Sequence, residues 1–287
     1  MLDKKIIGVD IGGTKILAGR VENETVTVTA QCNTPSEKNQ QEVINEVIET
    51  IEKIFTEDIY GIGIGVPGLV DIREGLVYDV QNIPSWKRVP LKKELEKHFG
   101  VPVYVNNDAN CYVVGEKYFG KAKHYENFVG VTLGTGLGAG IFINNQLHNG
   151  VNCGAGEFGS IPYLDSNFER YCSGQFFSLV KNINGELAFS KAENKDVAAL
   201  QLFKEFGEHL GTFFQLVMYS LAPEAIVIGG SISKGFRFFS EAMFQKINEF
   251  PFEQVKNSMK IEVTETSQMP ILGAASLCYN AELMFHY

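Results

Sequence analysis

The chain has no long apolar run and opens without an apolar leader. No stretch of its 287 residues approaches the ~18 apolar residues that a membrane-spanning helix needs. Residues 1–5 lead directly into a strand pattern, without the apolar core and cleavage site of a signal peptide. We therefore expect a soluble, cytoplasmic protein with no membrane partner.

Cysteine is scarce and scattered. The chain has five, at positions 32, 111, 153, 172 and 278, and none of them forms a Cys-x-x-Cys pair. An odd number at such wide spacing predicts no disulfide framework. This usage is typical of a protein in a reducing cytosol.

Positive charge is also in deficit. The net charge of −9 and the pI of about 5.2 argue against the basic face that a nucleic-acid partner requires. They do not exclude a phosphorylated ligand, because backbone N–H groups, a helix end and a metal ion can hold phosphate locally.

The remaining composition is ordinary for a globular protein, at 45% hydrophobic and 21% charged residues. The length allows one large domain or two of about 100–200 residues each. Apolar periodicity predicts strands at residues 5–11, 16–21, 25–32, 60–66, 101–105, 127–133, 139–143 and 225–228. It predicts helices at residues 41–55, 91–99, 109–118 and 203–221, and a last one from about residue 273. Residues 148–175 lack periodicity, which favours a long functional loop.

One arrangement occurs twice. Residues 5–21 read as strand, Gly/Thr turn and strand, and residues 127–143 repeat that order. We interpret this as a distant internal duplication. The first three strands form a meander, so their sheet is not purely parallel.

The first turn has the residues of a phosphate-binding loop. Gly12 and Gly13 let the backbone approach an anion, and Thr14, Lys15 and the turn amides can donate to phosphate oxygens. Asp10 would be repelled by phosphate but can hold a hydrated Mg²⁺ that bridges to it. The alternative is a hairpin without a ligand. The Walker pattern is rejected, because Thr and Lys are in the wrong order and a strand follows where a helix should.

The second turn and a later strand end carry similar signals. Gly134, Thr135 and Gly136 suit the far side of a polyphosphate, although glycine-rich hairpins without ligands are common. Gly229 and Gly230 end a buried strand and would let a flat ligand such as adenine lie against the backbone.

Two further segments offer acid–base and hydroxyl-binding groups. Asp108 stands at a strand end and helix start, where it either caps the helix or takes a proton from a hydroxyl that attacks a γ-phosphorus. Asn107 beside it can bind a neighbouring hydroxyl. Glu157, in a glycine-rich loop, either accepts hydrogen bonds from sugar hydroxyls or is simply solvated.

These elements, in this order, resemble the ROK family of sugar kinases (repressor, open reading frame, kinase) over residues 5–280. The resemblance implies an α/β fold of the ribonuclease H-like, actin-like ATPase type, shared by actin, Hsp70 and hexokinase. It has two lobes with a cleft between them, and each lobe is a mixed β-sheet flanked by helices. Residues 1–118 and about 270–287 would form the smaller lobe, and residues 119–269 the larger.

The resemblance also implies roles. Asp108 would be the general base, and ATP, with Mg²⁺ held by Asp10 through water, would bind at Gly12, Gly13, Thr14, Lys15, Gly134, Thr135, Gly136, Gly229 and Gly230. Segments 65–71 and 82–86 resemble family segments near the sugar, and residues 168–174 resemble the family's Leu-Glu-x-x-x-Ser-Gly. The implied sugar-binding residues are Gly68, Asn82, Asn107, Asp108, Glu157, Ser160 and Glu169.

Two departures concern zinc. Ser160 stands where most members have a His that touches both the sugar and a structural zinc, and residues 161–167 contain no cysteine or histidine where most have a cysteine cluster. No tetrahedral Cys/His set is present, so we expect a variant without structural zinc. This leaves the sugar open among glucose, which we expect first, N-acetylhexosamines, mannose and fructose.

The resulting expectation is an ATP:hexose phosphotransferase, glucokinase-like, acting at the 6-hydroxyl and forming a homodimer. Family repressors carry an N-terminal helix-turn-helix, for which the early first strand leaves no room. A catalytically silent sugar or nucleotide sensor is the main alternative. An actin/Hsp70-like ATPase with a protein partner is the other, disfavoured by Asn107, Asp108 and the paired glutamates.

Overall fold

The chain divides into two units that each carry a β-sheet. In the computed structural model, which describes residues 4–80, 82–264 and 266–284, one unit consists of Met1–His124, Gln146–Ala155 and Glu265–Tyr287, and the other of Tyr125–Asn145 and Gly156–Thr264. The lobes expected from the sequence begin and end at other residues, and they stay a prediction. Residues 1–3, 81 and 285–287 of the expected smaller lobe, and residue 265 of the larger, lie outside the described part.

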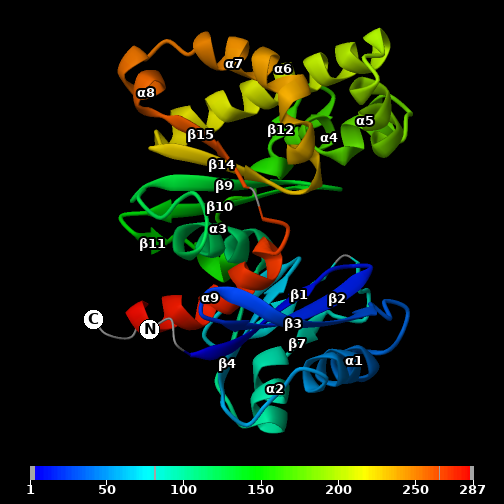
Figure 1. The fold of residues 1–287 in the computed structure, drawn as a ribbon, viewed down its shortest axis with the longest axis vertical. Helices are drawn as coiled ribbons and strands as arrows, with labels where there is room; N and C mark the ends of the chain where they lie inside the picture. Colours follow the sequence, from blue (N-terminus) through cyan, green and yellow to red (C-terminus); the bar gives the residue numbers. More distant parts are fainter. Residues whose placement is uncertain (1–3, 81, 265, 285–287) are drawn as a thin grey trace. The chain divides into compact units, whose positions relative to one another are not determined.

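The opening strand is the central strand of the first sheet (Figure 1). The strand order is β3-β2-β1-β4-β8. β1 (Lys5–Ile11), β2 (Lys15–Glu22) and β3 (Thr25–Asn33) form the expected antiparallel meander. β4 (Ile59–Val66) and β8 (Val103–Asn107) run parallel to β1, so the sheet is mixed, as expected.

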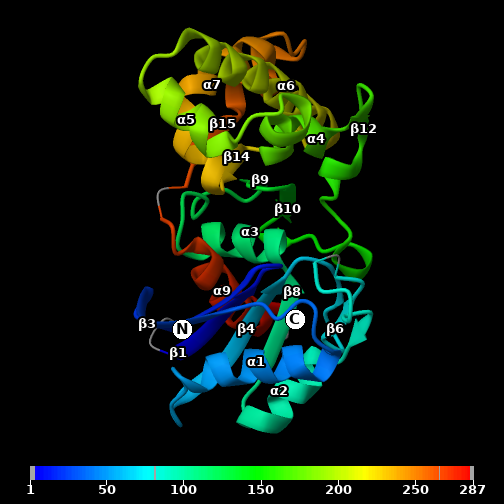
Figure 2. The same cartoon turned by 90° about the vertical axis from the view of Figure 1, so that its right-hand side faces the viewer.

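Helices cover both faces of this sheet (Figure 2). α1 (Gln40–Glu52) and α2 (Leu91–Phe99) lie on one face, and α3 (Asp108–Tyr118) and α9 (Met269–Met284) on the other. Helical spacing of apolar residues gives α1 one buried side, formed by Val43, Ile44, Val47 and Ile51.

α9 approaches the sheet closely because two paired strand positions lack side chains. Gly8 of β1 lies opposite Gly63 of β4. A Cβ at Gly8 would lie 2.0 Å from the Ile271 carbonyl oxygen, and one at Gly63 would lie 1.9 Å from that of Ala274. The helix backbone therefore packs directly on the strands, which fixes the carboxyl ends of β1 and β4.

The sheet of the second unit repeats this topology. β10 (Leu137–Ile143) pairs antiparallel with β9 (Phe128–Leu133), and β14 (Ala225–Gly229) and β15 (Lys260–Val263) follow in parallel, as β2, β1, β4 and β8 do. The shared strand order supports the duplication inferred from the two strand–turn–strand segments.

Phenylalanine dominates the core of the second unit. α6 (Val197–Leu221) packs against α7 (Phe236–Asn248), α5 (Gly185–Glu193) and α4 (Phe168–Cys172), with α8 (Glu253–Ser258) preceding β15. The buried phenylalanines of this helical layer and of the segments that connect it are Phe168, Phe176, Phe177, Phe203, Phe206, Phe213, Phe214, Phe239 and Phe250.

The predicted strands and long helices are confirmed with shifted ends: α6 begins at Val197 and α9 at Met269. The sequence did not predict α5, α7, α8, β15 or a small sheet of β5 (Leu69–Asp71), β6 (Leu76–Tyr78) and β7 (Arg88–Val89). The prediction of one irregular loop at 148–175 is wrong in detail. The short elements in that region are η1 (Val151–Cys153), η2 (Phe158–Ser160), the hairpin of β12 (Pro162–Tyr163) and β13 (Ser166–Asn167), and α4. β11 (Gln146–Leu147) precedes the region and η3 (Phe176–Val180) follows it. η4 (Ser231–Gly235) follows β14.

Candidate active site

Three parallel strands bring the predicted residues of the first unit together at their carboxyl ends. Asp10 on β1 pairs with Gly65 on β4, which pairs with Asn106 on β8. The carboxyl ends of parallel strands are a common location for ligand sites in α/β folds. The segments that follow carry Gly68, Asn107 and Asp108.

The first turn, residues 12–15, is held by its own backbone and by Thr34. The Gly12 N–H donates to the Lys15 carbonyl (2.9 Å). The Thr34 hydroxyl donates to the Gly12 carbonyl (2.7 Å), and its N–H donates to the Thr14 carbonyl (3.0 Å). In the described part of the chain, the amides of Gly13 and Thr14 and the Thr14 hydroxyl meet no acceptor. They are donors available to an anion.

Asn82 lies against this turn. A Cβ at Gly13 would lie 2.4 Å from the Asn82 Cβ, so only glycine fits there. The expected phosphate loop and one expected sugar-binding residue are therefore neighbours in the first unit.

Asp10 is a partly buried carboxylate without a hydrogen-bond donor among the described residues. Burial raises its pKa from 3.8 to about 6, while nearby Lys15 opposes the rise. Its environment therefore disfavours the charged form unless a cation compensates it.

Asn107, and not Asp108, supplies the cap of α3. The Asn107 side-chain oxygen accepts from the N–H groups of Ala109 (2.9 Å) and Asn110 (3.4 Å). Its amide nitrogen donates to the Gly68 carbonyl (3.3 Å). Asp108 is exposed on the first turn of the helix, and its Oδ1 accepts from the adjoining Ala109 N–H (2.9 Å). The cap of α3 is therefore Asn107, and Asp108 is not required for that role.

A buried amide network supports this segment. Asn106 donates to Asn149 (3.0 Å) and accepts from Asn110 (3.0 Å), from the Asn107 N–H (2.8 Å) and from the Cys153 thiol (3.0 Å). Long-range side-chain bonds therefore fix the backbone before Asp108. The sequence offered no signal for Asn149.

The second turn, residues 134–136, is likewise held by backbone hydrogen bonds and by a hydroxyl from another segment. The Gly134 N–H donates to the Gly136 carbonyl (3.0 Å), the Gly174 N–H to the Gly134 carbonyl (2.8 Å) and the Ser173 hydroxyl to the Thr135 carbonyl (3.1 Å). Among the described residues, no acceptor engages the amides of Thr135 and Gly136 or the Thr135 hydroxyl. These donors match those of the first turn.

Glu169 is bonded to this second turn. Its Oε2 accepts from the Leu137 N–H (3.0 Å) and its Oε1 from the Gln175 side chain (2.8 Å). A Cβ at Gly136 would lie 2.5 Å from Oε2. An expected sugar-binding carboxylate thus contacts the expected phosphate loop within the second unit.

Glu157 precedes the 3-10 turn η2, Ser160 is its last residue, and both are exposed. Burial, followed by the charge of Glu169, raises the pKa of Glu157. The two glutamates are therefore electrostatic neighbours.

The glycine pair at the end of β14, Gly229 and Gly230, lies beside the second turn. Gly229 pairs with Thr132 of β9. Gly230 has φ of 86°, and a Cβ there would lie 2.3 Å from the Leu133 carbonyl oxygen, which requires glycine. The expected adenosine-binding and phosphate-binding segments are thus adjacent.

No group of three or more His, Cys, Asp or Glu side chains is arranged to hold a metal ion in the described ranges. Where the cysteine cluster was expected to be missing, the ring of Tyr163 stacks on Phe168 (4.3 Å between centroids), and its hydroxyl hydrogen-bonds with His209 Nδ1 (3.1 Å). The residues present do not fit zinc, and its absence stays a prediction.

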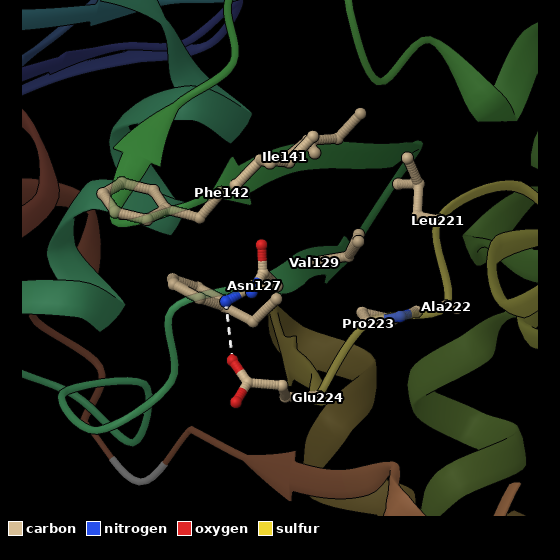
Figure 3. A pocket seen from close by; sticks show the side chains of 10 residues that line it. Asn127, Val129, Ile141, Phe142, Leu221, Ala222, Pro223 and Glu224 are labelled. Carbon is tan, nitrogen blue, oxygen red and sulfur yellow. Dashed lines mark hydrogen bonds between the residues drawn. The ribbon is translucent and has the colours of Figure 1, made fainter. Parts of the chain in front are cut away.

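A small pocket of about 160 Å³ lies elsewhere, at the amino-terminal ends of β9 and β14 (Figure 3). Glu224 closes it by accepting from the Asn127 N–H (2.7 Å). The lining contains none of the predicted site residues, and those next to these strands, Gly134 to Gly136, Gly229 and Gly230, lie at their carboxyl ends. No helix in the described part is long and apolar enough to cross a membrane.

Known proteins with similar sequences include both kinases and regulators. The model of the ROK family matches residues 6–281. A glucokinase of Thermotoga maritima is 28% identical over 95% of this chain and 96% of its own length. The xylose repressor of Bacillus subtilis is 26% identical over 94% of this chain and 76% of its own length. The structure of a ROK family glucokinase from Streptomyces griseus, in complex with glucose and AMPPNP, matches with a TM-score of 0.82 and 27% identity, covering 95% of this chain and 98% of that one.

Proposed function

The chain belongs to the ROK family, with the actin-like α/β fold of its sugar kinases, and from that premise we propose that it transfers the γ-phosphate of ATP to a hexose. Glucose is the first candidate, because the Thermotoga maritima and Streptomyces griseus relatives are glucokinases. The 6-hydroxyl is the proposed acceptor.

The observation that carries this proposal is the pair of matching turns. Each follows the central strand of its sheet. Within the residues that the structure describes, each presents amides and a threonine hydroxyl without acceptors, at Gly13 and Thr14 in one unit and at Thr135 and Gly136 in the other. Consecutive free N–H groups bind anions. We propose that each turn binds nucleotide phosphate, with Gly229 and Gly230 of the second unit beneath the adenosine.

Asp108 is the proposed general base. Since Asn107 caps α3, the Asp108 carboxylate is not needed for the cap and is exposed to a substrate. Phosphoryl transfer requires mainly positioning and charge neutralisation, together with a group that accepts the hydroxyl proton. The amide network under Asn106 supports a fixed position for that group.

Asp10 fits a hydrated Mg²⁺, because its carboxylate is partly buried and no residue in the described ranges donates a hydrogen bond to it. Mg²⁺ would neutralise charge on the phosphates. Lys15 adds a fixed positive charge to the same turn. Magnesium and the homodimer both stay predictions.

For the sugar, we propose contacts with Glu157, Glu169, Gly68, Asn82 and Asn107, together with Ser160. Glu169 already accepts two protein hydrogen bonds, but a carboxylate has about four lone-pair sites, so it can accept sugar hydroxyls as well. Ser160 is shorter than the histidine usual in the family, which leaves the identity of the sugar to experiment.

The test is an assay of ADP release coupled to a visible readout, over a panel of hexoses and N-acetylhexosamines. We expect one sugar to stimulate ADP release strongly. Asp108→Asn should lower kcat by about 10²–10⁴-fold, whereas the control Asp79→Asn, on an exposed residue, should leave it unchanged. Wild-type turnover by Asp108→Asn would contradict the mechanism.

A sugar sensor without catalysis is the second candidate, and the similarity to the xylose repressor favours it. A sensor would bind a sugar, measured by calorimetry, without releasing ADP on any member of the panel.

A further inference from the structure

A hydroxyl residue from a neighbouring segment ties back a carbonyl of each phosphate-binding turn. Thr34, 8% exposed, donates its hydroxyl to the Gly12 carbonyl. Ser173, fully buried, donates its hydroxyl to the Thr135 carbonyl. Neither residue belongs to a turn, and Thr34 lies outside every motif found in the sequence.

The geometry of the peptide unit gives these bonds a consequence. In a planar trans peptide, the carbonyl of one residue and the N–H of the next point in opposite directions. Holding the Gly12 carbonyl toward Thr34 therefore directs the Gly13 N–H away from Thr34. In the same way, Ser173 holds the Thr135 carbonyl and so directs the Gly136 N–H outward. The Gly174 N–H donates to the Gly134 carbonyl (2.8 Å), and this bond directs the Thr135 N–H outward.

The amides directed outward are among those that find no acceptor in the described residues. Glycine makes this orientation vulnerable, because Gly12–Gly13 and the peptide before Gly136 can rotate with little steric resistance. A rotated peptide would present a carbonyl oxygen, which repels phosphate, in place of an N–H.

We infer that Thr34 and Ser173 are positioning residues that prevent this rotation, one in each unit, and thereby keep the turn amides available to the nucleotide phosphates. The inference rests on the proposed function only for the identity of the ligand. It assigns to both residues an effect on phosphate binding and none on adenosine or sugar.

The test compares Thr34→Val, which replaces the hydroxyl by a methyl group of similar shape, with Ser173→Ala. Binding of Mg-AMPPNP and of adenosine is measured by calorimetry. Loss of one hydrogen bond to a charged group predicts at least about tenfold weaker binding of Mg-AMPPNP, and we expect unchanged adenosine binding. Thr34→Ser keeps the hydroxyl and should restore wild-type affinity.

Thr27→Val is the matched control, because Thr27 lies on β3 and its exposed hydroxyl donates to the Arg20 carbonyl away from the turn. Urea unfolding of each variant separates a loss of stability from a loss of phosphate binding. Wild-type Mg-AMPPNP affinity in both Thr34→Val and Ser173→Ala would overturn the inference. So would equal losses for adenosine and Mg-AMPPNP, or a wild-type protein that binds no nucleotide.

The proposed function fails separately. Suppose that the wild-type protein binds Mg-AMPPNP through these residues, but that no sugar of the panel stimulates ADP release. The kinase proposal would then be wrong, and the positioning roles of Thr34 and Ser173 would stand.

Discussion

Replacing Asp10 by asparagine should stabilise the unliganded protein while impairing its activity. Burial raises the pKa of Asp10 from 3.8 to about 6 in the folded chain. The folded protein therefore binds its proton more tightly than the unfolded chain, and stability from this group is lost as the pH rises from about 4 to about 6. Above that range, the ionised carboxylate makes folding about 3 kcal/mol less favourable.

Asparagine has nearly the same shape and carries no charge to bury. The free energy of unfolding of Asp10→Asn should exceed that of the wild type by about 1.5 kcal/mol at pH 5 and about 3 kcal/mol at pH 8. The measurement is urea unfolding of both proteins at several pH values in this range, without nucleotide or divalent cation. ADP release should fall in the variant, because asparagine cannot hold a hydrated cation as a carboxylate does.

Asp58→Asn is a control of opposite sign. A hydrogen bond from Lys5 lowers the pKa of Asp58 to about 2, so this variant should be less stable than the wild type, by an amount that does not change between pH 5 and 8. A stability difference for Asp10→Asn that is constant with pH, or that favours the wild type, would refute the reasoning about Asp10.

Two further comparisons test the support of the site. Asn107→Ala and Asn39→Ala each remove a helix cap and should each lower the free energy of unfolding by about 1 kcal/mol in urea. Only Asn107→Ala should also lower sugar-dependent ADP release. Equal ADP release by the two variants would show that Asn107 caps α3 without contributing to the site. Gly8→Ala should destabilise the protein by roughly 3 kcal/mol or more, because its Cβ would lie 2.0 Å from the Ile271 carbonyl oxygen. The control is Gly134→Ala: no atom lies within 4 Å of a Cβ at Gly134, so this variant should melt near the wild-type temperature. If Gly8→Ala melted at the same temperature as Gly134→Ala, the close packing of α9 on β1 would be contradicted.

Local sequence was sufficient for the strands, the long helices and the two turns. Apolar periodicity within a few residues predicted β1, β2 and β9, and glycine next to threonine predicted the turns after β1 and β9. Short strands such as β5 to β7 were not predicted, because two or three residues do not establish a period. The internal duplication could be inferred from the sequence, because it repeats a local pattern of strand, turn and strand.

The site required contacts between distant residues. The sequence suggested Asp108 as a possible cap of α3, and the backbone geometry assigned the cap to Asn107 instead. Glu169 resembled a sugar ligand, and the fold adds its bond to the Leu137 amide, 32 residues away.

The sequence by itself determined where the chain turns and predicted which residues bind phosphate, because both depend on neighbouring residue types. Only the tertiary structure decided that Asp10 is buried enough for its pKa to rise to about 6, and that Thr34 and Ser173 hold the turns. Burial and long-range hydrogen bonds depend on how strands and helices pack, which no local pattern specifies.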